Sequence, residues 1–150
     1  MALSAIKQSL ISTQTLGTLP LRLIAGIIFS AHGAQKLFGW FGGYGLEGTG
    51  QWMDSIGLTP GYLMALGAGS AEFFGGLLLL LGLFTRLSSI VLAFTMVVAI
   101  FSVHFVNGLF MSNNGYEFAL ALLGISLAIA IQGGGKYALD NALSTKFKGE

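Results

Sequence analysis

The sequence contains no cysteine and very little charge. Its 150 residues include seven Lys or Arg and six Asp or Glu, which is 9% of the chain, whereas a soluble domain usually carries about a quarter. Because so few charged residues cannot cover the surface of a water-soluble globule, apolar side chains must face lipid. The absence of cysteine excludes disulfides, thiolate metal sites, iron–sulfur clusters and cysteine-attached haem. The net charge of +1, without a basic cluster, excludes a nucleic-acid partner.

Four apolar segments follow one another, at about residues 19–41, 62–84, 87–106 and 116–131. Each approaches the roughly 20 helical residues that cross a hydrocarbon core of ~30 Å, and lipid requires helices because each backbone group must be bonded within its own segment. We therefore predict an all-α fold: one membrane domain, residues 1–150, with four transmembrane helices. A cleavable signal peptide is disfavoured because the first segment starts late and contains Arg22.

The basic residues predict the orientation. Six of them flank one side of the four segments, and only Lys36 lies on the other. The six are Lys7, Arg22, Arg86, Lys136, Lys146 and Lys148. This split predicts that both termini, including the tail at 133–150, lie in the cytoplasm. We expect the membrane to be a bacterial inner membrane.

Local expectations follow from this orientation. We expect Arg22 to reach the lipid headgroups and Arg86 to lie in a tight turn between the second and third segments. We expect a short amphipathic helix in the first dozen residues, and a solvated tail from Ser144 to Glu150.

The connection between the first two segments, 39–60, alternates glycines with aromatic residues. We expect residues 49–56 to form a short helix at the membrane boundary, with Trp52, Met53 and Ile56 facing inward. Two interpretations remain open: a surface loop with aromatic anchors, or a lid over a site that opens outward.

Five ionisable residues lie within or at the ends of the apolar segments. They are His32, Lys36, Glu72, His104 and Glu117. Such groups are costly in lipid and usually mark function, and all four helices contribute one to the same outer half. We therefore predict that the five line one cavity. The structural alternative is that Glu72 pairs with Lys36 or a histidine, the histidines are polar core residues, Glu117 caps the fourth helix, and Lys36 extends to the interface.

Four stretches of sequence resemble the DoxX family of small membrane proteins, in the family's order. They are the stretch from Arg22 to Lys36, the one from Glu72 to Arg86, His104 to Gly108, and Asn114 to Glu117 with the exit Gly133 to Asp140. The resemblance implies a four-helix membrane bundle. It also implies links to quinone metabolism, since one relative is a subunit of a thiosulfate:quinone oxidoreductase. Thiosulfate chemistry is not carried over, because no cysteine is present to hold a sulfur intermediate.

The leading hypothesis is a quinone-linked membrane redox component, such as a subunit of an oxidoreductase. His32 or His104 would bind the head group, Glu72 or Glu117 would carry the proton, and Lys36 would stabilise the quinol anion. Phe29, Phe73 and Phe74 would hold the ring and tail.

Three alternatives stay open. His32 and His104 could ligate a b-type haem, or together with Glu72 and Glu117 hold a divalent metal. The chain could also be a non-catalytic membrane anchor or assembly partner of a redox subunit. A transporter would require the chain to form a homo-oligomer, because four helices make a small pathway.

Overall fold

The computed structural model describes residues 16–146, and these residues form helices and turns without a β-strand. The long helices are α2 (Thr18–Phe38), α4 (Gly61–Leu81), α5 (Thr85–Ala99) and α6 (Glu117–Gln132). The short ones are η1 (Trp40–Gly42), α3 (Gly45–Ser55), η2 (Ile100–His104), η3 (Phe105–Asn107), η4 (Met111–Asn113) and α7 (Leu139–Lys146). The all-α prediction is confirmed, and each predicted segment is helical. The helix expected in the first dozen residues lies outside the described part of the chain.

Two helices are long and apolar enough to cross a membrane. They are α4 and the continuous helix Thr85–Asn107, which joins α5 to η2 and η3. Only 33% and 28% of these two spans are buried, whereas a core helix of a soluble protein would be mostly buried. The apolar helix α6 has 16 residues, and α2 has 21 residues but carries Arg22, His32 and Lys36. Length and composition therefore support two of the four predicted spans.

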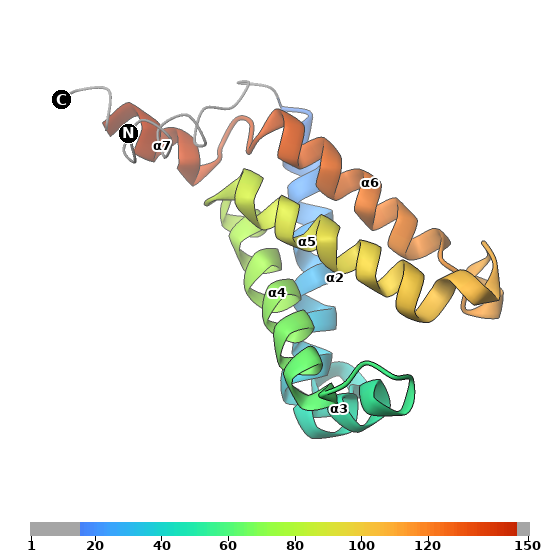
Figure 1. Ribbon diagram of the computed structural model, residues 1–150. Coiled ribbons are helices and arrows are strands. Elements are labelled where there is room, and N and C mark those ends of the chain that lie inside the picture. Colours follow the sequence, from blue (N-terminus) through green and yellow to red (C-terminus); the bar gives the residue numbers. More distant parts are fainter. Residues whose placement is uncertain (1–15, 147–150) are drawn as a thin grey trace, which may run out of the picture.

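The long helices form two pairs, α2 with α4 and α5 with α6. The first pair packs closely because glycines remove side chains from the contact: a Cβ at Gly33 would collide with the backbone of Phe73, and one at Gly76 would lie 2.5 Å from the backbone nitrogen of Ser30. Figure 1 shows the pairs close together near α7 and diverging toward the opposite end. A buried cluster including Phe29, Leu79, Leu92, Met96 and Ile129 fills the space between the pairs.

Arg22 is fully buried near α7. The prediction that it extends to the lipid headgroups is therefore wrong. Nη1 of Arg22 donates to the carbonyl of Leu79 at 2.9 Å, and its Nη2 donates to the carbonyl of Tyr137 at 3.5 Å. The last carbonyls of a helix have no partner within it and carry partial negative charge. Arg22 therefore binds the carboxyl end of α4, a stronger site for its guanidinium than the lipid surface.

Asp140, 2% exposed, caps the beginning of α5. Its Oδ1 accepts from the Phe84 N–H at 2.7 Å, and its Oδ2 accepts from the Thr85 N–H at 2.9 Å and the Thr85 hydroxyl at 2.6 Å. A carboxylate at this position satisfies amides that the helix leaves free. The helix consequently begins at Thr85, and Arg86 lies in its first turn rather than in the connecting turn, which corrects the prediction.

Arg86 completes the same end of the molecule. Its Nη1 donates to the carbonyls of Ala130 and Ile131, at 2.8 and 2.7 Å, where α6 ends. Ser144 is buried within α7, so the solvated tail begins later than predicted. We call Arg22, Thr85, Arg86 and Asp140 the arginine clamp, because together they link the ends of α4, α5, α6 and α7 to each other and to α2.

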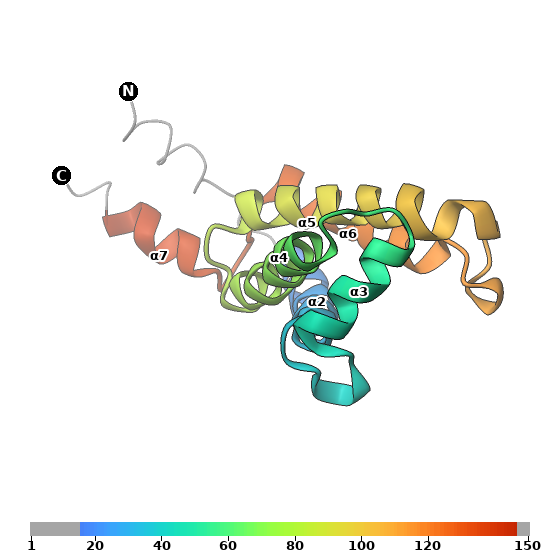
Figure 2. The ribbon, with the colours of Figure 1, turned by 60° about the horizontal axis from the view of Figure 1, so that its bottom comes forward.

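At the opposite end, α3 covers the ends of α2 and α4 (Figure 2). The short helix predicted at 49–56 is longer and starts earlier. Met53 is buried as expected, but Trp52 and Ile56 are 42% and 38% exposed. The Asp54 carboxylate accepts the Gly61 N–H at 2.7 Å, so α3 is fixed to the first turn of α4 and does not hang as a free loop.

Candidate functional site

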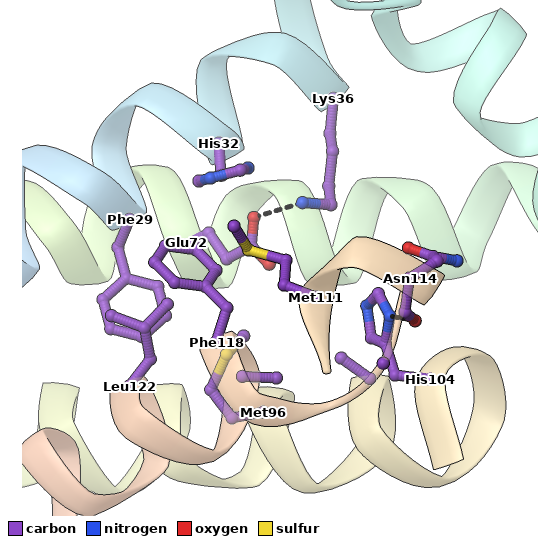
Figure 3. A pocket seen from close by; sticks show the side chains of 13 residues that line it. Phe29, His32, Lys36, Glu72, Met96, His104, Met111, Asn114, Phe118 and Leu122 are labelled. Carbon is purple, nitrogen blue, oxygen red and sulfur yellow. Dashed lines mark hydrogen bonds and ion pairs between the residues drawn. The ribbon is translucent and has the colours of Figure 1, made fainter. Parts of the chain in front are cut away.

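A cavity of about 270 Å³ lies between the diverging helix pairs. We call it the wedge cavity. Figure 3 shows His32 and Lys36 entering it from α2, Glu72 from α4, and His104 from η2, which continues α5. Its wall consists of Phe29, His32, Lys36, Glu72, Met96, Ala99, His104, Met111, Asn114, Gly115, Phe118, Ala119 and Leu122. Four of the five ionisable residues predicted to share a cavity are therefore together in it.

Lys36 and Glu72 form an ion pair at the wall of the cavity. The Nζ and Oε2 atoms are 2.5 Å apart, and the two side chains are 24% and 5% exposed. Burying a carboxylate without a partner is strongly unfavourable, so the ammonium group is what permits Glu72 to lie here. Gly69 leaves room for the lysine stem, since a Cβ there would be 3.2 Å from the Cβ of Lys36. The pairing anticipated in the structural alternative is formed, and it borders a cavity.

His104 is held in one orientation by a backbone hydrogen bond. Its Nδ1 lies 2.9 Å from the carbonyl oxygen of Asn114. A carbonyl only accepts, so Nδ1 carries the proton and Nε2 is an acceptor whenever the ring is neutral. His104 belongs to η2, a π-helical segment, and such segments widen a helix locally and recur at functional sites.

His32 lies across the cavity entrance, near an aromatic ring of α6. The ring centroids of His32 and Phe118 are 6.1 Å apart and the planes are inclined by 49°. The cavity therefore presents an imidazole and a phenyl ring beside the ion pair. Planar groups pack well against such rings.

Glu117 is not part of the cavity wall, although the sequence placed it with the other four. Its Oε1 accepts the Met111 N–H at 2.6 Å. The carboxylate thus fastens η4 to the start of α6. This is a local structural role, of the kind that the capping alternative anticipated.

Of the three phenylalanines expected to hold a ligand, only Phe29 lines the cavity. Phe73 instead packs edge-on against Phe38 and Phe74, with ring centroids 5.2 and 5.3 Å apart, and Phe74 is 56% exposed. The helix pitch turns these two residues away from the neighbouring Glu72.

Sequence reasoning missed Met96, Met111, Phe118 and Leu122, which supply much of the apolar wall. Nothing distinguishes Phe118 from the other eleven phenylalanines of the chain except its place one residue after Glu117. Glu117 had indicated the turn of α6 that lies near the site, so the aromatic side chain next to it could have been predicted as part of the cavity wall.

The donor set proposed for a divalent metal does not come together. Within residues 16–146, no group of three or more His, Asp or Glu residues is arranged so that it could hold a metal ion. Glu117 binds the backbone of Met111 instead, and His32, Glu72 and His104 line the cavity without forming such a group.

Comparisons with known proteins agree with the membrane character. The chain is 40% identical over 114 residues to "Putative oxidoreductase CatD" of Bacillus subtilis, covering 76% of this chain and 78% of that protein. It is 33% identical over 140 residues to "Inner membrane protein YqjF" of Escherichia coli, covering 89% and 97%. An uncharacterized protein of Haemophilus influenzae is 34% identical over 133 residues, covering 84% and 90%.

No solved structure matches the chain. The family model of DoxX matches residues 17–105, which include α2, α4 and α5 with the pair Lys36–Glu72 and both histidines. This match and the relatives' similarity over most of their length show that the chain is a membrane protein of the DoxX family.

Proposed function

We propose that the protein crosses the inner membrane four times and binds a quinone head group in the wedge cavity as a component of a quinone-linked redox system. The observation that carries the proposal is the ion pair Lys36–Glu72 at the wall of a cavity that also presents two histidines and an apolar surface. Such a pair costs desolvation energy that an apolar contact would not. Its exposure to a cavity gives it access to a ligand.

The proposed topology is supported by the distribution of charge along the fold. Arg22 and Arg86 lie in the arginine clamp, and Lys136 and Lys146 lie beside it, while Lys36 lies at the cavity end. The clamp end would therefore be cytoplasmic and the cavity end would face the periplasm. The faces of α4 and α5 that point away from the bundle are apolar, as contact with lipid requires.

The cavity has the size and lining for a single planar ring. Its volume of about 270 Å³ falls just below the ~300–1,000 Å³ of common small-molecule pockets. Phe118 and Met96 offer apolar contact to the faces of a ring, while the polar side chains lie at its wall. A quinone head group fits this description better than the much larger haem macrocycle.

The chemistry would divide between the chain and a partner. Reduction of a quinone to a quinol takes up two electrons and two protons. The electrons would come from a separate redox subunit, since this chain has no cysteine to hold an iron–sulfur cluster. The chain would supply hydrogen bonds and protons: Glu72 as proton carrier, Lys36 as the cation beside a reduced oxygen, and the histidines as partners of the carbonyls. The relative named an oxidoreductase supports redox chemistry, and the one named an inner membrane protein supports the location.

Binding of a short-chain ubiquinone analogue to the purified protein in detergent tests this proposal. Glu72→Gln should weaken binding by about tenfold, the equivalent of one hydrogen bond to a charged group. Glu47→Gln is the matched control, because this carboxylate is exposed on α3 at the same end and lines none of the cavities. Equal affinity in the three proteins would contradict the proposal.

A second pair of variants tests the apolar wall. Phe118→Leu should weaken quinone binding severalfold, because it removes ring contacts worth about 1 kcal/mol. Phe94→Leu is the control, since Phe94 is 69% exposed on α5 and lines none of the cavities. An absorption spectrum of the same preparation would reveal haem. A haem band without quinone binding would favour the haem alternative. The absence of both a haem band and quinone binding would favour the membrane anchor.

A further inference from the structure

Two more hollows adjoin the wedge cavity. The first, about 300 Å³, lies between α3, α4 and α5, and we call it the α3 hollow. The second, about 260 Å³, lies between the end of α2, η1 and α3, and we call it the loop hollow. The α3 hollow and the wedge cavity share Lys36, Glu72, Ala99, His104 and Asn114. They are therefore neighbouring chambers with a common wall.

Lys36 is the point where the three spaces meet. It lines the wedge cavity, the α3 hollow and the loop hollow, and its ammonium group contacts Glu72. Trp52 lines both the loop hollow and the α3 hollow. Three adjoining spaces, each sharing wall residues with the next, thus lie between the surface formed by η1 and α3 and the Glu72 carboxylate.

We propose that the loop hollow and the α3 hollow form an aqueous route by which water and protons from the outer phase reach Glu72, with Lys36 at the junction. The route itself does not depend on the identity of the ligand. Its use to supply protons to a quinone rests on the proposed function.

Each of the three spaces has polar side chains in its wall, as an aqueous route requires. The loop hollow is lined by Gln35, Lys36, Tyr44 and Thr49 with two glycines and Trp52, and Tyr44 is 81% exposed at its mouth. The wedge cavity combines phenylalanine, methionine and leucine side chains with five polar ones, His32, Lys36, Glu72, His104 and Asn114. The α3 hollow between them adds Thr95 and Ser102, so polar groups that water can contact line each step from the surface to Glu72.

The route is built from rigid contacts. A Cβ at Gly43 would collide with Gln35, and one at Gly50 would lie 2.9 Å from the Cα of Tyr62. These glycines let η1 and α3 lie directly against α2 and α4.

The proton balance is simple. The Glu72 carboxylate takes a proton from hydronium in the α3 hollow, which leaves water behind, and then gives that proton to a ligand in the wedge cavity. No electron follows this route, and no bond other than O–H changes. Lys36 limits the charge change at the junction because its ammonium group stays beside the carboxylate.

The native chain contains no cysteine, so single cysteines can be introduced without further changes. Thr49→Cys reports on the loop hollow, Ala68→Cys on the α3 hollow, and Ala99→Cys on the wall shared with the wedge cavity. Ala65→Cys is the matched control, because Ala65 is fully buried on α4 and lines none of the three spaces. The reagent is the membrane-impermeant trimethylammonium ethyl methanethiosulfonate, added to intact spheroplasts.

We expect the cysteines at 49, 68 and 99 to react from the outside about tenfold faster than the one at 65, because only a hydrated, ionised thiol reacts rapidly. Reaction at 49 without reaction at 68 and 99 would show a closed hollow and overturn the route. Reaction at 99 only after lysis, from the cytoplasmic side, would overturn it as well. Each variant must elute in detergent like the native species, which excludes misfolding. If the Ala99→Cys variant does not fold, the reactivity of the Ala68→Cys variant decides whether the route is open.

The short-chain ubiquinone analogue separates this proposal from the proposed function. If both hold, the analogue slows reaction at 99 and leaves reaction at 49 unchanged. Full outside reactivity without protection by the quinone would contradict the quinone site and leave the route intact.

Discussion

The arginine clamp and the wedge cavity both bury charge, but they stabilise it in different ways. In the clamp, Arg22 and Asp140 bond to backbone groups at helix ends and are almost completely buried. In the cavity, Lys36 and Glu72 bond to each other and border open space.

This contrast separates structural charge from functional charge. A helix end is a fixed partner, so the side chain that binds it holds two elements together and cannot serve a ligand. A side chain that lines a cavity can exchange its partner. The clamp should therefore govern stability and the cavity should govern binding, and four substitutions test that division.

Asp140→Ala should have the largest effect. It removes three hydrogen bonds from a buried carboxylate and exposes the start of α5. We expect a loss of about 4 kcal/mol in unfolding free energy, since each bond to a charged group contributes about 1.5–3 kcal/mol and the three are not additive. Unfolding in mixed micelles, followed by circular dichroism, measures it. Glu47→Ala, at an exposed position, should change stability by less than about 0.5 kcal/mol. Equal losses of unfolding free energy in Asp140→Ala and Glu47→Ala would refute the stabilising role of the arginine clamp.

Lys36→Met should come next. It leaves the Glu72 carboxylate, 5% exposed, without its cation, and we expect a loss of about 2–3 kcal/mol, because breaking a buried pair from one side is costly. The double variant Lys36→Met/Glu72→Leu should recover most of this stability while failing to bind quinone. If the double variant is as unstable as the sum of the two single ones, Lys36 and Glu72 are not coupled.

Arg86→Glu should cost about 2 kcal/mol, because it removes two bonds to the carbonyls that end α6 and places a negative charge beside them. Membrane yield should fall more than quinone binding per folded molecule. Arg86→Lys should keep part of the stability. Normal yield with lost binding would assign Arg86 to the site instead.

Glu117→Gln should have the smallest effect, below about 1 kcal/mol, since an amide oxygen can still accept the Met111 N–H at this partly exposed position. Quinone affinity should stay within about twofold of the native value. A tenfold loss of affinity would return Glu117 to the role of proton carrier that the sequence allowed.

Much of the fold was predictable because it depends on local composition. The apolar runs predicted all four long helices, and α4 and α6 begin within one residue of the expected positions. The burial of Arg22 and its hydrogen bonds were not predictable, because its partners lie 57 and 115 residues away in the sequence. The same holds for Asp140, whose bonds to Phe84 and Thr85 span more than 50 residues.

The candidate site was predictable in its charges and not in its walls. Ionisable side chains are costly to place in lipid, and this identified His32, Lys36, Glu72 and His104 from the sequence. Helix rotation decided the apolar residues, and a π-helical segment such as η2 changes that rotation without a sequence signal. On α4, Phe73 and Phe74 directly follow Glu72 and are therefore turned away from the cavity, whereas Phe118 on α6 lines it.

The most direct test of the division between the two ends compares Glu72→Gln with Asp140→Asn in one titration with the short-chain ubiquinone analogue, scaled to the folded fraction of each protein. The account predicts that Glu72→Gln remains folded and loses about tenfold in affinity, and that Asp140→Asn loses folded protein while the remaining molecules bind like the native chain. Native affinity in folded Glu72→Gln, or weakened affinity in folded Asp140→Asn, would contradict it.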